Sequence, residues 1–375
     1  MNPIEREIVS CVAELNPNRA QQHRLRDAIS HLTDPERLIT TAVKEGLAGL
    51  LYRGCKNAGA LEGLEVRHRQ RLEVLYYATV RFNLRLIHDL KQVLEGLNEK
   101  KLPVVILQGM ALLPEIYEDI GLRPLTDIDL WVLPEDYQGL VGVLSGLGYE
   151  RGPLYPNTFR KGATIIDINT HVLGADRIRT RALLLALDQE QIYRDARSIS
   201  FEGSEALCLN KYDQVVLLSV HALKHSVSRL IWLVDIKALI AGFKTAHWKE
   251  LMDRAKVLGL ERAIAYVCFL LVRLFNGDLP VTCRRLSGAD RLSTFENKVL
   301  GRRIEGDCLP IWAPLILQSA GKPLMKRIAF FLENLFPKPE ILRQVFPYSS
   351  GSPVWQLYLK RALQVVGMMK REELR

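Results

Sequence analysis

Apolar residues recur every three or four positions along a long segment between residues 72 and 97. They are Leu72, Leu75, Tyr76, Val80, Ile87, Leu90, Val93, Leu94 and Leu97. This spacing places them on one face of an α-helix, so it predicts a long helix that ends near Asn98. Residues 4–55 contain shorter amphipathic segments, separated by the breaks Asn16-Pro17-Asn18 and Thr33-Asp34-Pro35. The first 100 residues are therefore predicted to be helical.

The hydrophobic period changes after residue 100. The run PVVIL at residues 103–107 predicts a short strand, followed by a glycine and a helical stretch to about residue 119. The run TDIDLWVL at residues 126–133 predicts a second strand, and residues 134–147 predict a helix. A hairpin is expected at residues 158–168, with its turn near Lys161-Gly162. This part of the chain is predicted to be a small mixed α/β unit.

Helical periodicity returns after Asn210. The four clearest helices are predicted at residues 212–226, 229–240, 248–258 and 261–275. The chain beyond residue 276 is helical where it is periodic, with prolines interrupting it. The expected fold class is α+β, with a small mixed-sheet core at residues 101–209. Helical regions at 1–100, 210–280 and 281–375 are expected to flank this core.

Composition excludes several classes of protein. The chain has 375 residues, 25% of them charged, and a formal net charge of +9, as in folded domains rather than disordered or fibrous ones. No apolar stretch approaches the roughly 18–20 residues of a membrane span, so no transmembrane segment is expected. The N-terminus carries two acids in seven residues and lacks the apolar region of a secretory signal, so a cytoplasmic location is expected. The positive charge favours an anionic partner, such as a nucleotide or a nucleic acid.

The strand at residues 126–133 carries two carboxylates on one face. Side chains at positions i and i+2 of a strand point the same way, so Asp127 and Asp129 project together while Ile128 and Leu130 face the core. Burying two adjacent carboxylates costs several kcal/mol, on the order of the cost of an unpaired charge, unless a cation neutralises them. Mg²⁺ or Mn²⁺ suits such oxygen ligands. The alternative is an edge strand whose acids simply face solvent.

Two further features strengthen the metal interpretation. Asp167 lies in the alternating run IIDIN, and if that strand pairs beside the Asp127 strand, three carboxylates converge. Asp176, and after it Glu150, are the next candidates for the third carboxylate. Gly109 lies where a strand meets a helix, and the N-terminus of a helix exposes backbone N–H groups that bind phosphate.

These residues resemble a known family. Gly109, the Asp127-Ile128-Asp129 strand and Asp167 resemble the three motifs of nucleotidyltransferases with the DNA polymerase beta-like fold. More narrowly, GLRPLTDIDL at residues 121–130 is similar to the GxRxxxDIDLLV block of the bacterial uncharacterised nucleotidyltransferase family. HALKH at residues 221–225 and RLIWLVD at residues 229–235 resemble a helical block of the same family. The resemblance extends over about residues 39–280.

The resemblance implies a Mg²⁺-dependent nucleotidyltransferase, with ATP or another NTP as the nucleotide substrate. Such an enzyme transfers a nucleoside monophosphate from the NTP to an acceptor hydroxyl and releases pyrophosphate. Residues 101–209 would then be the nucleotidyltransferase core, and residues 210–280 would bind nucleotide and acceptor. The implied catalytic residues and metal ligands are Asp127, Asp129 and Asp167.

Seven residues are candidates for binding the nucleotide. Arg and Lys match phosphate oxygens, Gly109 permits close approach of the backbone, and the paired histidines lie one turn apart on one helix face. For each cation, a solvated surface position is the alternative. The candidates are Gln108, Gly109, Arg123, Lys224, Arg229, His221 and His225.

The helical block also contains residues for which a structural role is expected. The paired histidines lack the Glu of an H-E-x-x-H motif, which disfavours a zinc site. Trp232 is expected in the core rather than under a base. Asp235 is expected to pair with Arg229 or Lys224.

Two departures from the family pattern keep other functions open. Gln108 stands where the family commonly has Lys, and Met110 where the superfamily often has Ser. A catalytically decayed binding or scaffold protein would explain both. A tRNA-modifying or toxin-like transferase is the other alternative, favoured by the basic stretch at residues 284–303. The acceptor could be a small molecule, a peptide, a glycan or RNA.

Overall fold

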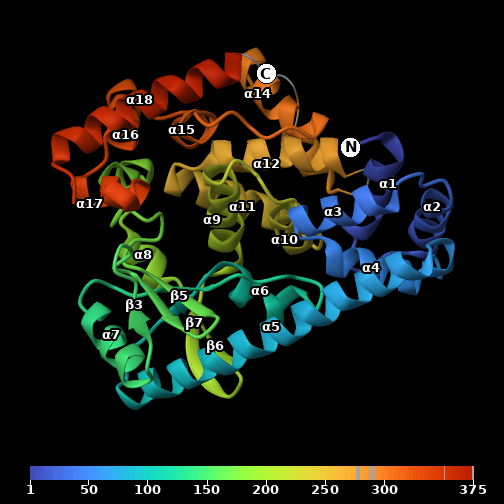
Figure 1. The fold of residues 1–375 in the computed structure, drawn as a ribbon, viewed down its shortest axis with the longest axis horizontal. Coiled ribbons are helices and arrows are strands. Elements are labelled where there is room, and N and C mark those ends of the chain that lie inside the picture. Colours follow the sequence, from blue (N-terminus) through green and yellow to red (C-terminus); the bar gives the residue numbers. More distant parts are fainter. Residues whose placement is uncertain (276–278, 287, 289–291, 350, 374–375) are drawn as a thin grey trace.

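The computed structural model describes all residues except 276–278, 287, 289–291, 350 and 374–375, and it describes no side chains from residue 366 onward. Within the described residues, a mixed sheet of seven strands is flanked by helices (Figure 1). This arrangement confirms the predicted α+β class. The strands are β1 (Val105–Ile106), β2 (Ile128–Trp131), β3 (Glu150–Arg151), β4 (Thr158–Lys161), β5 (Thr164–Asn169), β6 (Arg197–Phe201) and β7 (Ser204–Cys208).

The helices before the last strand fall into an N-terminal group and a few helices around the sheet. The N-terminal group is α1 (Pro3–Val12), α2 (Arg19–Ser30), α3 (Pro35–Glu45), α4 (Ala48–Asn57), η1 (Leu61–Gly63) and α5 (Val66–Glu99). The helices between strands are α6 (Gln108–Ile116), α7 (Tyr137–Gly146), η2 (Arg179–Leu184) and α8 (Gln189–Arg194). The 34-residue α5 runs along the sheet side of the molecule and confirms the predicted long helix (Figure 1).

The chain after β7 is helical, as the periodicity predicts. Four helices coincide closely with the predicted ones: α9 (Lys211–Lys224), α10 (Ile231–Ile240), α11 (Thr245–Leu258) and α12 (Glu261–Leu274). The remaining ones are α13 (Val281–Leu286), α14 (Thr294–Glu305), α15 (Ala313–Ser319), α16 (Leu324–Leu335), α17 (Pro339–Val345), η4 (Pro347–Ser349) and α18 (Val354–Glu373). Among the described residues, no helix is long and apolar enough to cross a membrane.

The register of the sheet decides where the carboxylates lie. The strand order is β3-β4-β5-β2-β1-β7-β6. β2 pairs in parallel with β5, and this pairing sets Asp129 directly opposite Asp167. β1 runs antiparallel to β2 on its other side, so the residue after β1, Leu107, hydrogen-bonds to the carbonyl of Asp129. The expected hairpin of β4 and β5 and its pairing beside β2 are both confirmed.

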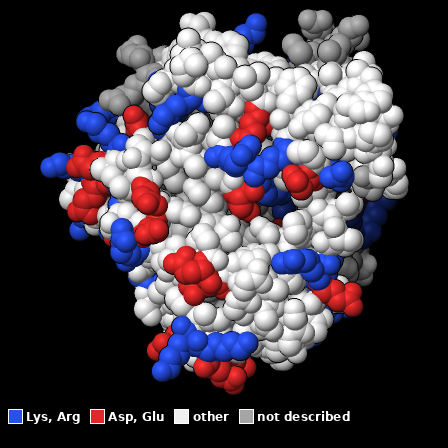
Figure 2. Space-filling model, turned by 90° about the vertical axis from the view of Figure 1, so that its left-hand side faces the viewer, with Lys and Arg blue, Asp and Glu red and all other residues white. Residues whose placement is uncertain are grey.

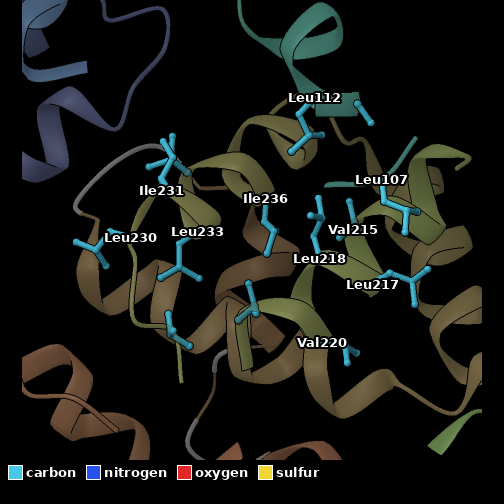
Figure 3. Close-up of a cluster of buried hydrophobic side chains, with 14 of the residues drawn as sticks. Leu107, Leu112, Val215, Leu217, Leu218, Val220, Leu230, Ile231, Leu233 and Ile236 are labelled. Atoms are coloured by element: carbon cyan, nitrogen blue, oxygen red, sulfur yellow. The ribbon is translucent and has the colours of Figure 1, made fainter. Parts of the chain in front are cut away.

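The hydrophobic core continues from the sheet into the helices above it. Leu107 at the end of β1 lies in one cluster with Val215 and Leu218 of α9 and Ile236 of α10 (Figure 3). These side chains are at most 6% exposed. Because α9 packs on the sheet through this cluster, the polar face of the helix is held at a fixed distance from β2.

The basic stretch at residues 284–303 is only partly described, because residues 287 and 289–291 lie outside the described part. Arg303 within it is not on the surface. It is 3% exposed, it forms an ion pair with Glu45 of α3, and its Nε donates to the carbonyl of Val227 at 2.7 Å. This arginine therefore ties α14 to the N-terminal helices and is not available to an RNA.

Candidate functional site

A cleft of about 590 Å³ lies between the strands β2 and β5 and the helices α9 and α10. All ten residues selected from the sequence line it: Gln108, Gly109, Arg123, Asp127, Asp129, Asp167, His221, Lys224, His225 and Arg229. They come from five separate segments of the chain. Cavities of 300–1,000 Å³ are typical of sites for small molecules. The cleft is therefore the candidate active site.

The three aspartates lie together in the cleft. Burial raises the pKa of Asp127. Burial, and then the charges of Asp127 and Asp167, raise the pKa of Asp129 well above its usual range. Thr126 donates a hydrogen bond to Asp127 and Thr158 donates one to Asp167. Among the described residues, none of the three forms an ion pair, so their mutual repulsion is offset only by the more distant charges of Arg123, Arg229 and Lys224.

This arrangement fits a divalent cation that also binds a substrate. Across the described part of the chain, no group of three or more His, Cys, Asp and Glu side chains is placed so that it could hold a metal ion. Mg²⁺ commonly takes one or two carboxylates and fills its other positions with water and phosphate oxygens. Repelling carboxylates that lack a positive partner are the donor set for such an ion.

The N-terminus of α6 faces the start of β2. Gln108, its first residue, has a positive φ of 54°, which is costly for a residue with a side chain and is typical of functional sites. Leu107 before it provides no side-chain cap, so in the described structure the first backbone N–H groups of α6 are not capped. Exposed N–H groups at a helix N-terminus bind anions, which supports a phosphate position beside Gly109.

Gly109 is packed against the guanidinium of Arg123. A Cβ atom at residue 109 would lie 2.0 Å from Nη1 and 2.4 Å from Cζ of Arg123, and 2.7 Å from Cδ2 of Leu125. Contacts below 3 Å force a neighbour to move, and here one neighbour is a buried guanidinium. Only glycine therefore lets α6 begin this close to Arg123.

Arg123 is held by a buried carboxylate rather than left free for a ligand. Its Nη2 donates to Asp235 at 2.9 Å, and Tyr117 donates to the other oxygen of Asp235 at 2.6 Å. The side chain of Asp235 is fully buried, and that of Arg123 is 8% exposed. The expected pairing of Asp235 with Arg229 or Lys224 is wrong, because α6 and the loop before β2 pack on α10 and bring Tyr117 and Arg123 nearer.

Substitution of Gly109 by alanine is expected to destabilise the protein by about 2 kcal/mol and to weaken nucleotide binding, because the added methyl displaces Arg123 from Asp235. Gly146→Ala is the matched control, since a Cβ there meets nothing within 4 Å and alanine favours the helix. Urea unfolding of both variants measures the difference. Equal stability of the two variants would contradict the close packing of Gly109.

The polar face of α9 forms the opposite wall. The rings of His221 and His225 lie 4.6 Å apart, and each contacts the ring of Trp232, at 5.2 and 5.6 Å. Burial, then His225, lowers the pKa of His221 well below its usual value, and burial lowers the pKa of His225 to about 4. Both imidazoles are thus neutral at pH 7. Trp232 was expected in the core. It is half-buried against the core and also lines the cleft, so this expectation is confirmed only in part.

Arg229 is positioned by a strained turn between α9 and α10. Val227, a buried β-branched residue, has a φ of 47°, which is a rare conformation for such a side chain. Its carbonyl accepts from Arg303, and the carboxylate of Glu45 accepts from the backbone N–H of Leu230. The buried pair of Glu45 and Arg303 therefore fixes the backbone on both sides of Arg229, which lies at the cleft beside Asp127.

The structure also brings residues into the cleft that the sequence interpretation left out or placed elsewhere. Asp176, considered for the third carboxylate, lines the cleft, but the position opposite Asp129 belongs to Asp167. Arg177 follows it in the dense run of charge ADRIRTR at residues 175–181, which was the available signal. Lys338 and Gln344 reach the cleft from the C-terminal helices, and no local pattern marks them.

Comparison with known proteins gives one match. Residues 31–276 match the family described as uncharacterised nucleotidyltransferases, which is about two thirds of the chain. No curated protein matches the sequence. The matched range contains all three aspartates and all seven candidate nucleotide-binding residues, whereas Lys338 and Gln344 lie outside it.

Proposed function

The chain belongs to the family of uncharacterised nucleotidyltransferases, and we propose that it transfers a nucleoside monophosphate from a Mg-bound NTP to an acceptor hydroxyl, with release of pyrophosphate. The observation that carries this proposal is the set of Asp129 and Asp167 on adjacent parallel strands, with Asp127 directly before the first of them. The carboxylates lie in a cleft opposite cationic side chains, as a charged phosphate substrate requires. The expected DNA polymerase beta-like superfamily and cytoplasmic location remain part of this proposal.

Different residues of the cleft bind the phosphates, position the backbone and hold the metal. The N–H groups at the start of α6 and the guanidinium of Arg229 bind the phosphates of the donor, as charge-assisted hydrogen bonds. Arg123 acts mainly by holding the start of α6 beside Asp235. Asp127 and Asp129 would hold Mg²⁺ or Mn²⁺, which supplies charge neutralisation at the α-phosphate and lowers the pKa of a bound hydroxyl.

Proton balance follows from the position of Asp167. The acceptor oxygen forms a bond to the α-phosphorus, the bond from that phosphorus to the β-phosphate oxygen breaks, and pyrophosphate leaves. Asp167, opposite Asp129, accepts the hydroxyl proton. The neutral rings of His221, His225 and Trp232 are tilted to one another and line the cleft, and a base packs against this aromatic wall without competing for the phosphate charge.

The face drawn in Figure 2 has no continuous basic band. On it, blue and red side chains are interspersed and meet near the centre. Nucleic-acid binding proteins generally present a basic patch or stripe. The charge on this face therefore gives no support to RNA over a small-molecule, peptide or glycan acceptor.

Mg²⁺ and an NTP together are expected to raise the melting temperature, because a ligand that binds only the folded state stabilises it by RT ln(1 + [L]/Kd). At 100 times the Kd this amounts to about 2.7 kcal/mol. The NTP with EDTA should give a much smaller shift, since the aspartates repel bare phosphates. Equal shifts with and without chelator would contradict a metal-bridged site and indicate a purely cationic phosphate site.

A further inference from the structure

A second group of cations lies at the edge of the cleft. Lys224 of α9 and Arg177 of the segment after β5 line the cleft, and Arg181 of the same segment lies beside Gly174, which also lines it. Lys224 and Arg181 converge beside Gly174: the position of a Cβ atom on Gly174 would be 3.3 Å from Nη1 of Arg181 and 3.9 Å from Nζ of Lys224. Oδ1 of Asp176 lies 3.9 Å from the same point. We call Lys224, Arg177 and Arg181 the distal cation cluster.

The distal cation cluster is charged but not neutralised. Within the described residues, none of its three members forms an ion pair, and the buried Nε of Arg181 has no hydrogen-bond partner. Arg177 donates to Gln344 at 2.9 Å, and Asp176 accepts from Asn157 at 2.9 Å. The carboxylates of Asp176, Glu333 and Asp129 lie near enough to act on Arg181 and Lys224, but among the described residues none of them forms an ion pair with the cluster.

Burial and like charges act together on the cations of the cluster. Burial, and then the charge of Arg181, lowers the pKa of Lys224 to about 8. Burial, and then the charge of Arg177, lowers the pKa of Arg181 to about 10. Holding three like charges together in a partly buried place is unfavourable, and a bound anion relieves it. A phosphate group is such an anion.

The distal cation cluster and the Gly109 end of the cleft lie near different aspartates. The backbone N–H of Leu107 donates to the carbonyl of Asp129, and because β1 runs antiparallel to β2, the chain continues from Leu107 toward Asp127, which lies just before β2. The charges of Arg123 and Arg229 oppose the rise in the pKa of Asp127, whereas the charge of Lys224 opposes the rise in the pKa of Asp129. The two cation groups therefore face different carboxylates.

We propose that the distal cation cluster is an acceptor subsite that binds a phosphate group, so that the acceptor is a phosphorylated molecule with a hydroxyl a few bonds away. The inference rests on the proposed function, in which the donor phosphates occupy the Gly109 end. The acceptor phosphate stays unchanged while its hydroxyl attacks the α-phosphorus, pyrophosphate leaves and Asp167 takes the proton. Lys224, which the sequence interpretation assigned to the nucleotide, belongs to the acceptor in this proposal.

The C-terminal helices hold this subsite in place. Gln344 of α17 accepts from Arg177, and Glu333 of α16 accepts from the backbone N–H groups of Arg179 and Thr180 at 3.1 and 2.7 Å. These helices lie outside the range that matches the family. Recognition of the acceptor is thereby tied to the part of the chain that the family match does not cover.

The test is calorimetric titration of inorganic phosphate into the full-length protein saturated with Mg²⁺ and an α,β-methylene NTP, which cannot transfer its nucleotide. Phosphate is expected to bind, and Arg181→Gln should weaken it at least about tenfold. Arg160→Gln is the matched control, because Arg160 is an exposed residue of β4 that does not line the cleft, and it should change binding less than about twofold. If Arg181→Gln fails to fold, Lys224→Met replaces it, with the same expected loss.

Three results would overturn the subsite: no phosphate binding to the wild type, binding that neither variant of the cluster weakens, or binding that the nucleotide analogue abolishes. The third would assign the cluster to the donor phosphates. If the analogue itself does not bind, the proposed function fails, but phosphate titration of the nucleotide-free protein still decides the subsite. If Arg181→Gln weakens phosphate binding to the nucleotide-free protein, the cluster is an anion site. If Arg181→Gln leaves that binding unchanged, the anion site is overturned.

Discussion

Replacement of Asp129 by asparagine is expected to lower nucleotide turnover at least about 1,000-fold while leaving the fold intact. The amide keeps the size of the side chain but removes the charge that holds the metal. Because burial and the charges of Asp127 and Asp167 disfavour ionised Asp129, its loss should also raise the melting temperature of the nucleotide-free protein by about 1–3 °C. Steady-state pyrophosphate release and thermal unfolding measure the two effects. Asp127→Asn should behave in the same way.

The gain in melting temperature should depend on pH. A carboxyl group whose pKa is raised on folding disfavours the folded state as the pH rises from its unfolded value, near 4, through its folded value. Asp129→Asn removes this penalty, so its advantage over the wild type should be larger at pH 8 than at pH 5. Asp253→Asn, at an exposed position of α11, is the control and should show no such trend. Unchanged turnover in Asp129→Asn would remove this residue from the mechanism.

Replacement of Asp235 by asparagine is expected to reduce the free energy of unfolding by about 3–5 kcal/mol, because it leaves the buried guanidinium of Arg123 without its carboxylate. Urea unfolding measures the loss, and Asp253→Asn should stay within about 0.5 kcal/mol of the wild type. The double variant Arg123→Met, Asp235→Asn removes the unpaired charge and should recover part of the stability. A loss below about 1 kcal/mol in the single variant would contradict the buried pair.

The carboxylate strands could be predicted from the sequence because strand alternation is a local rule. The residues Asp127 and Asp129 must share a face once TDIDLWVL forms a strand, and the run IIDIN imposes the same rule on Asp167. The local rule does not show that the two strands are neighbours. The structure shows that β2 and β5 pair, in parallel. The long helix α5 was predictable for the same reason, since its period persists over the whole segment.

The interactions that the sequence did not predict are made between distant segments. The hairpin of β6 and β7 has the run RSISF, in which the alternation rests on only two apolar residues and is too short to predict a strand, so the hairpin was not predicted. The predicted partner of Asp235 was wrong because the observed partner, Arg123, is 112 residues away in the sequence. Arg123 reaches Asp235 only because α10 packs beside α6. Lys338 and Gln344 were also missed because they reach the cleft through long-range packing of the α17 region. No local sequence pattern predicts that packing.

Catalysis by the three aspartates is tested most directly by incubating the purified protein with Mg²⁺, each of the four NTPs in turn and a panel of phosphorylated hydroxyl compounds, and measuring pyrophosphate release. We expect pyrophosphate release that requires Mg²⁺ and depends on one or more of the acceptors. In Asp129→Asn this release should fall at least about 1,000-fold. Asp253→Asn should release pyrophosphate at the wild-type rate. Release that is equal in Asp129→Asn and the wild type would contradict the account.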